Sequence, residues 1–243
     1  MTSNPMLQAK RFENTVLEGE PMSISGAVNK TIILNTIVVI AAFVGWNIYA
    51  SGMTDRANML TLLSLIASAI LAVVAIFNPK TSPVTAPFYA IFEGIVVGGV
   101  SYSYAALYNG IVPAALFATL TTLFVMLILY KTKLIQATQT FKKVVMTAGF
   151  ALFIYYLVSL IGSFFGHSLI ANTFGTPLGI GISVFACAIA GLYFILDFDL
   201  VEQYSQKMLP KYMEWYSALG ILFTTVWLYF EILRLIAQLN SRR

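Results

Sequence analysis

Seven long apolar segments constrain the fold of this chain more than any other feature of its sequence. They run roughly over 31–51, 57–78, 86–109, 111–130, 143–166, 177–202 and 214–239. Each is about as long as the ~20 residues that an α-helix needs to cross the hydrocarbon core of a bilayer. Of the 243 residues, 59% are hydrophobic and 10% are charged, whereas a soluble domain has about 25% charged residues. The sequence therefore predicts an all-α, polytopic membrane protein with seven transmembrane helices.

The connections between these segments are short, which indicates one compact membrane domain over 30–243. A polar segment interrupted by proline and glycine precedes it over 1–29, and we expect a loosely ordered cytoplasmic tail there. A short interfacial helix over 22–28 is the alternative for the last residues of that tail.

The distribution of lysine and arginine predicts the orientation in the membrane. With the N-terminus inside, three basic residues of the loops and termini fall outside, namely Arg56, Arg242 and Arg243, while Arg234 lies in the last segment. Ten fall inside: Lys10, Arg11, Lys30, Lys80, Lys131, Lys133, Lys142, Lys143, Lys207 and Lys211. No basic cluster has interleaved aromatic residues, so we expect a lipid bilayer and no nucleic acid as partner. A last segment that enters the membrane partway and returns is an alternative, because it would relocate the two C-terminal arginines.

Six of the ten acidic residues lie in or at the ends of the apolar segments, where carboxylates are costly and often functional. They are Glu93, Asp197, Asp199, Glu202, Glu214 and Glu231. Asp199 and Glu202 share a helix face, whereas Asp197 lies about 200° around the helix from Asp199. Glu231 and Arg234 have the spacing of an ion pair within one helix. Glu93 lies at a depth similar to that of Asp199, so the geometry allows these two to meet across the bundle.

Carboxylates in an apolar bundle have two functional outcomes. Neighbouring acids share a proton, because desolvation and like charge both disfavour ionisation, or they bind a cation such as calcium, which prefers several oxygen ligands. We therefore expect calcium as a bound or transported ion, coupled to pH. The alternative is that the acids form hydrogen bonds and ion pairs that lock the helices. No basic residue near Asp199 in the sequence is placed to neutralise it. For Glu202 and Glu214, the alternative is that water solvates them near the membrane interface.

Enzyme chemistry is not expected from this sequence, and neither is an obligatory cofactor. The only histidine, His167, falls in a loop outside the membrane, so no histidine cluster offers a transition-metal site. No GxSxG-like stretch is present for a serine nucleophile. The last apolar segment contains no lysine that could carry retinal.

Several stretches of the sequence resemble one family of membrane proteins. Residues 195–200, Ile-Leu-Asp-Phe-Asp-Leu, are similar to the sixth helix of the Bax inhibitor-1 superfamily, also called the transmembrane Bax inhibitor motif family. Phe92-Glu93-Gly94, with Gly98 one turn on, resembles its third helix. Residues 211–216 and 228–235 look like those of a bacterial, YccA-like branch. The resemblance extends from Met22 over nearly the whole remaining chain.

The resemblance implies a fold with six helices around a central seventh and a pH-dependent calcium leak across the membrane. It also implies an aspartate pair between the sixth and seventh helices that acts as a proton-sensitive latch. Asp199 matches the sixth-helix member of this pair. The seventh-helix member would fall near Thr224, which carries no charge. Either Glu231, Glu214 or Glu93 substitutes for it, or this branch lacks the latch.

Two main functional hypotheses follow. The first is a calcium leak channel or cation/proton exchanger of the bacterial cytoplasmic membrane, gated by protonation with Asp199 as the central group. Its candidate proton- and ion-sensing residues are Asp199, Asp197, Glu93, Glu231, Glu202 and Arg234, and its candidate metal ligands are Asp199, Asp197 and Glu93.

The second is a non-transporting regulator of membrane proteolysis or stress that binds another membrane protein. It is suggested by the missing seventh-helix aspartate and by a GxxxG surface at Gly94 and Gly98. A third possibility, transport of a small organic solute, is disfavoured because no broken helices occur at matching places in two halves.

Overall fold

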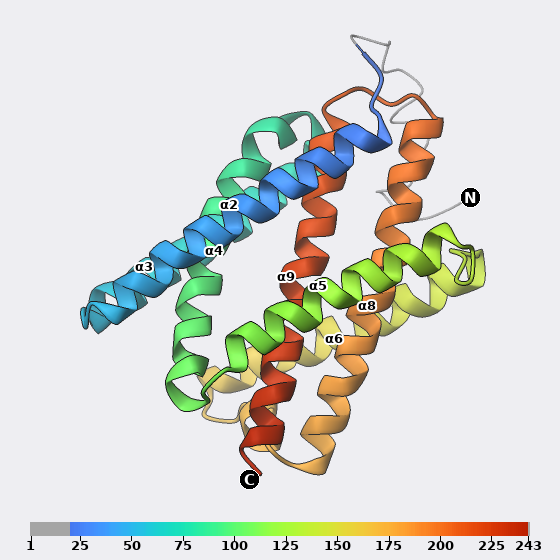
Figure 1. The fold of residues 1–243 in the computed structure, drawn as a ribbon. Helices are drawn as coiled ribbons and strands as arrows, with labels where there is room; N and C mark the ends of the chain where they lie inside the picture. Colours follow the sequence, from blue (N-terminus) through green and yellow to red (C-terminus); the bar gives the residue numbers. More distant parts are fainter. Residues whose placement is uncertain (1–19, 243) are drawn as a thin grey trace.

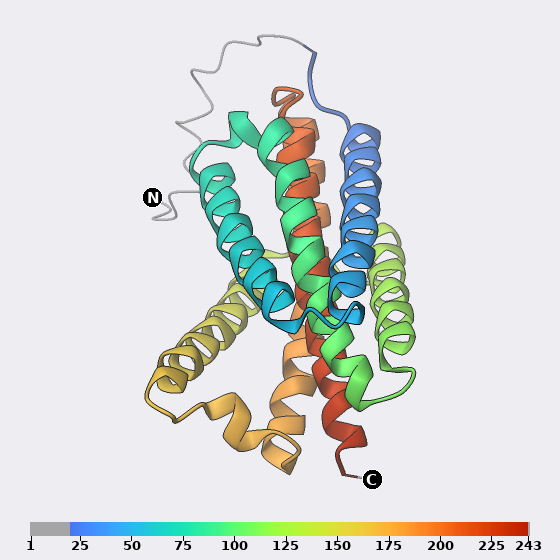
Figure 2. The same cartoon turned by 90° about the vertical axis from the view of Figure 1, so that its left-hand side faces the viewer.

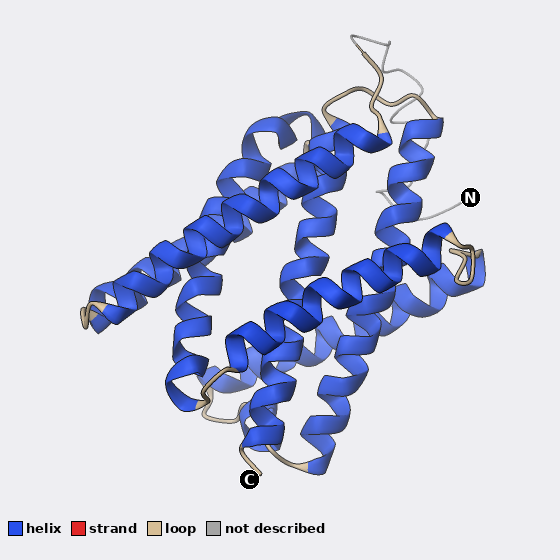
Figure 3. Cartoon of the chain, viewed as in Figure 1, coloured by secondary structure: helices blue, strands red, loops and turns tan. Residues whose placement is uncertain are grey.

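The computed structural model describes residues 20–242, and this part of the chain folds into helices without a β-strand (Figure 3). Seven helices are long and apolar enough to span a membrane. They are α2 (Ile24–Ala50), α3 (Thr54–Phe77), α4 (Ser82–Leu107), α5 (Ile111–Lys131), α6 (Gln139–Phe164), α8 (Pro177–Gln206) and α9 (Met213–Asn240). A 3₁₀ turn, η2 (Pro79–Thr81), precedes α4, and the short helix α7 (Leu169–Thr173) connects α6 to α8. The predicted all-α, seven-helix membrane fold is confirmed.

Several helices begin earlier than hydropathy alone predicts, because polar residues cap their first turns. The first span starts at Ile24 rather than near position 31, and the hydroxyl of Ser23 accepts a hydrogen bond from the amide of Gly26 at 2.9 Å. Thr138 caps α6 in the same way through Phe141. A side chain that satisfies an otherwise unpaired amide stabilises the start of a helix. Residues from Ile24 therefore belong to the first span and not to a separate interfacial helix, while 1–19 of the expected tail lie outside the described residues.

The last helix, α9, occupies the centre of the bundle (Figure 1). It packs against α2, α4, α5 and α8, and it is as buried as α4 and far more buried than α3 or α5. Helix α3 packs mainly on α4, and α6 packs on α8, so both lie farther out. The expected central seventh helix is confirmed. Because α9 runs unbroken over 28 residues, the alternative of a segment that enters partway and returns is wrong.

The two glycines of the GxxxG pattern in α4 serve the internal contact between α4 and α2. A Cβ atom at Gly94 would collide with Val38 and Ala41 of α2, and one at Gly98 would collide with the backbone at Ala42. Small residues allow this close approach of two helices within a membrane. The pattern is therefore covered inside the bundle and does not form the partner-binding surface that the sequence suggested.

The eight lysines that the structure describes all lie at one end of the bundle, which we call the lysine end. They are Lys30, Lys80, Lys131, Lys133, Lys142, Lys143, Lys207 and Lys211. Helices α2, α4, α6 and α9 begin there, whereas Arg56 and Arg242 lie at the opposite end. The helix directions thus place the lysines on one side, as the sequence predicted.

Candidate functional site

Asp197 of α8 faces Thr224 of α9, the position where the family resemblance places the second latch aspartate. The Thr224 hydroxyl donates a hydrogen bond of 2.6 Å to Oδ2 of Asp197. Among the described residues, no basic side chain lies within ion-pair distance of this carboxylate. Asp197 is partly buried, whereas Thr224 is buried. The sequence assigned the latch position to Asp199, and the structure places Asp197 opposite Thr224 instead.

Asp199 lies farther around α8, toward α6, and is neutralised. Lys142 of α6 forms an ion pair with its Oδ2, and the amide of Gln203 donates a hydrogen bond to the same oxygen. The expectation that no basic residue compensates Asp199 is therefore wrong. Lys142 lies 57 residues away in the sequence, so local spacing gave no indication of this pair.

Glu231 and Arg234 form the ion pair that their spacing predicted, inside a larger polar cluster. The hydroxyl of Tyr156 from α6 donates to Oε1 of Glu231 at 2.7 Å, and the indole of Trp227 donates to the same atom at 3.1 Å. Arg234 also donates to the Tyr156 hydroxyl at 2.7 Å and lies over its ring, 5.0 Å from the centroid. This cluster connects α6 to α9 toward the end of the bundle opposite the lysine end, and its charges are balanced.

Glu93 and Glu202 lie apart from the residues described so far. Glu93 is buried in α4, with Ser68 and Tyr89 as polar neighbours, and the structure does not bring it to Asp199. Glu202 is exposed and accepts hydrogen bonds from the Tyr130 hydroxyl and from Gln206.

The three candidate metal ligands do not gather around one point. Within the described part of the chain, no group of three or more His, Cys, Asp or Glu side chains is arranged to hold a metal ion. Asp199 faces Lys142, Asp197 faces Thr224, and Glu93 lies on a different helix, so these three do not form one calcium site in this conformation.

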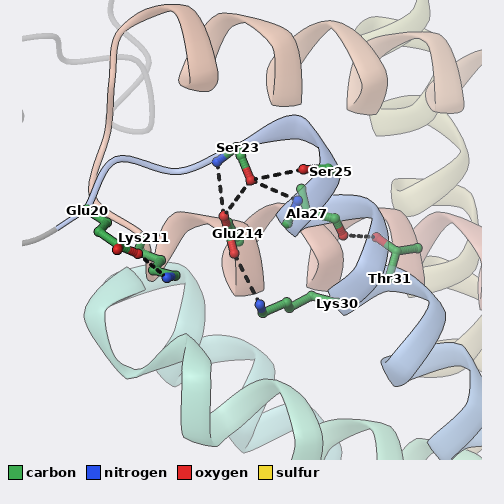
Figure 4. Close-up of polar contacts among 9 residues, drawn as sticks. Glu20, Ser23, Ser25, Ala27, Lys30, Thr31, Lys211 and Glu214 are labelled. Atoms are coloured by element: carbon green, nitrogen blue, oxygen red, sulfur yellow. Dashed lines mark hydrogen bonds and ion pairs between the residues drawn. The ribbon is translucent and has the colours of Figure 1, made fainter.

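Glu214 is the acid whose role the sequence reasoning missed. It is only 2% exposed rather than solvated, and it accepts hydrogen bonds from the amide and hydroxyl of Ser23 at 3.0 and 3.1 Å. The ammonium of Lys30 lies 3.2 Å from its other oxygen (Figure 4). A Cβ atom at position 26 would collide with this carboxylate, so Gly26 leaves room for it. The available signal was an acidic residue in the first turn of a helix, where the dipole favours it.

Two further contacts hold the same N-terminal segment to the loop before α9. The amide of Met22 donates a hydrogen bond of 2.8 Å to the carbonyl of Leu209. Lys211 forms an ion pair with Glu20 (Figure 4). The hydrogen bond from Lys211 holds the pKa of the exposed Glu20 carboxyl below its usual value. We call the contacts of residues 20–30 with Leu209, Lys211 and Glu214 the N-terminal clasp.

A cavity of about 690 Å³ lies between α6, α8 and α9 and is lined by both aspartates of α8. Lys142 of α6 and Thr224 of α9 also line it, together with mostly apolar and aromatic side chains. We call it the α8–α9 cavity. Asp197, which has no basic partner among the described residues, and Asp199, which is paired with Lys142, therefore line the same cavity.

The fold and this set of residues define an integral, multi-pass membrane protein with several carboxylates within its helix bundle, two of which line a cavity. The chain matches the family described as Bax inhibitor 1 like over residues 4–241. It therefore belongs to the Bax inhibitor-1 family, as the sequence motifs predicted. No curated protein matches the chain.

Proposed function

We propose that the protein mediates a pH-sensitive leak of calcium, as a channel or in exchange for protons, and that Asp197 is the gating group. One observation supports this proposal more than any other. Asp197 lines a cavity in the membrane region, and of the described residues only Thr224 compensates it, through a single hydrogen bond. A partly buried charge without a basic partner is unfavourable, so the ionised carboxylate attracts either a proton or a cation.

The other carboxylates of the bundle are less suited to this role. Asp199, Glu231 and Glu214 each have a basic partner, and Glu202 is exposed. Glu93 is buried in α4 and does not line the α8–α9 cavity. We therefore transfer the central role from Asp199 to Asp197, and we assign Asp199 with Lys142 to the mouth of the pathway at the lysine end.

The direction of the pH response follows from the hydrogen bond between α8 and α9. A hydroxyl donates more strongly to an ionised carboxylate than to a neutral acid. Protonation of Asp197 therefore weakens its bond with Thr224 and loosens the contact between the two helices. We expect the leak to increase as the pH falls.

The proposal places the protein in a bacterial cytoplasmic membrane with the lysine end in the cytoplasm, because loop lysines collect on that side. It includes no catalytic reaction and no obligatory cofactor.

Reconstituted vesicles test the gating role. Calcium flux is recorded between pH 5 and 8 for the parent, Asp197→Asn and Asp199→Asn, with Asp55→Asn as control because Asp55 is exposed in the first turn of α3. We expect acid-stimulated flux in the parent and control, and a flux in Asp197→Asn that no longer responds to pH. Asp199→Asn should change the rate while keeping the response. An unchanged pH response in Asp197→Asn would contradict the proposal.

A non-transporting regulator is the second candidate, and the threonine in place of an aspartate favours it. Absence of calcium flux at every pH, together with recovery of one stoichiometric membrane protein by the tagged chain, would support this candidate against the first.

A further inference from the structure

The α8–α9 cavity has the dimensions and the lining of a site for a small organic molecule. Its volume is about 690 Å³, within the range of roughly 300–1,000 Å³ that ligand sites occupy. Its walls come from α6, α8 and α9, with Ile76 of α3 at the edge. Helices α3 and α6 pack on different neighbours and lie apart on this side of the bundle (Figure 2).

The charges that line this cavity leave one negative charge uncompensated. Asp197, Asp199 and Lys142 are its charged residues, and Lys142 is paired with Asp199. The nearby Glu231 and Arg234 balance each other. Asp197 is thus the unbalanced charge, and within residues 20–242 its one hydrogen bond comes from Thr224.

Aromatic side chains line the same cavity as Asp197. Tyr193 lies one helical turn before Asp197 on α8, so the two share a face. Trp227 lies three residues after Thr224 on α9, and its ring packs edge-on against Tyr193 with centroids 5.5 Å apart. Phe223 and Tyr216 also line the wall. Aromatic faces attract cations, and ammonium groups are commonly recognised by such rings.

The sequence of α6 provides space for this arrangement. A Cβ atom at Gly149 would collide with the ring and hydroxyl of Tyr193. Because α6 has glycine at this point, the Tyr193 side chain can approach the backbone of α6 closely, and both residues line the cavity.

From these contacts we propose that the α8–α9 cavity binds a hydrophobic organic monocation, with its ammonium group on Asp197 and its apolar body against the aromatic walls. Calcium prefers six to eight oxygen ligands, whereas this lining is mostly apolar and aromatic and suits an organic cation better. The phosphate of a lipid headgroup would be repelled by Asp197. This binding does not require ion conduction, so it goes beyond the function proposed above.

Binding of a matched pair of compounds to the full chain in maltoside detergent micelles, which carry no ammonium group, tests this inference. One compound is 4-phenylbutyl-trimethylammonium, and the other is its uncharged analogue in which carbon replaces nitrogen. Equilibrium dialysis measures the Kd of each, after subtraction of uptake by empty micelles. We expect the parent to bind the cation at least about tenfold more tightly than the neutral analogue, equivalent to about 1.4 kcal/mol.

Variants assign that preference to residues. Asp197→Asn should remove the preference for the cation and Tyr193→Leu should reduce it severalfold, while Asp55→Asn should leave it unchanged. Equal affinity of the parent for the two compounds would overturn the inference and indicate an apolar cavity filled by lipid tails. This comparison within the parent stands even where a variant does not fold. If the parent binds the organic cation selectively but shows no calcium flux, only the proposed calcium leak is rejected.

Discussion

Single residues decide how this bundle tolerates its carboxylates, and four different solutions occur. Asp199 forms an ion pair with a lysine of another helix, and Glu231 forms one with an arginine of its own helix. Glu214 forms an ion pair with a lysine and also accepts hydrogen bonds from Ser23. Asp197 accepts one hydrogen bond, from the hydroxyl of Thr224. Among these four carboxylates, Asp197 has the weakest compensation, and this makes Thr224 an informative position.

Thr224→Val removes the hydroxyl donor and nearly preserves the shape of the side chain. Loss of a hydrogen bond to a partly buried carboxylate should destabilise the fold by about 1–3 kcal/mol, and the looser α8–α9 contact should raise calcium flux at neutral pH. Thermal unfolding in detergent and vesicle flux measure the two effects. Thr225→Val is the matched control, because the Thr225 hydroxyl bonds only to the carbonyl of Ile221 in its own helix. Equal effects of the two substitutions would argue against a role for the contact with Asp197.

Local spacing could predict some of these residue contacts but not others. Glu231 and Arg234 are three residues apart, so their pair follows from helix geometry. The basic partners of Asp199 and Glu214 lie on other helices, and Ser23 is 191 residues from Glu214 in the sequence. Which of two aspartates faces α9 depends on the rotation of α8, and hydropathy does not fix this rotation because the helix is apolar on nearly all sides.

At the scale of helices, the sequence predicts number and type well, because a span is defined by its own length and apolar composition. It predicts helix starts less well, since polar caps extend α2 to Ile24. It also does not show which face of a helix is internal. Gly94 and Gly98 in α4 suggest a contact with a small-residue surface, and the structure assigns that contact to α2.

Gly98→Leu tests the α2–α4 contact. A side chain at this position collides with the backbone of α2 at Ala42, so the two helices must separate. Overpacking of this kind costs about 1–3 kcal/mol and sometimes more, and we expect a lower unfolding temperature in detergent. Gly181→Leu serves as control, because no atom lies within 4 Å of a Cβ atom built there. A Gly98→Leu protein as stable as the Gly181→Leu protein would show that the close approach is not required.

For the molecule as a whole, the N-terminal clasp connects the first span to the central one. Ser23 and Lys30 at the start of α2 contact Glu214 at the start of α9. At the lysine end, a buried carboxylate therefore connects these two helices (Figure 4). Because α9 packs against most of the other long helices, a change at the clasp should be transmitted to the contact between α8 and α9.

Glu214→Gln keeps the size of the side chain and removes its charge, which leaves Lys30 without its partner. We expect a loss of about 1–3 kcal/mol in stability, since a buried carboxylate that accepts several hydrogen bonds is replaced by a weaker acceptor. Hydrogen exchange measured by mass spectrometry should show faster exchange in a peptide covering residues 20–30. Lys211→Met is the control. It breaks the pair with Glu20, and that pair is exposed and screened by solvent, so exchange beyond the first residues of the peptide should stay as in the parent. If both variants exchange alike, the buried carboxylate does not hold the segment, and the backbone bond between Met22 and Leu209 suffices to do so.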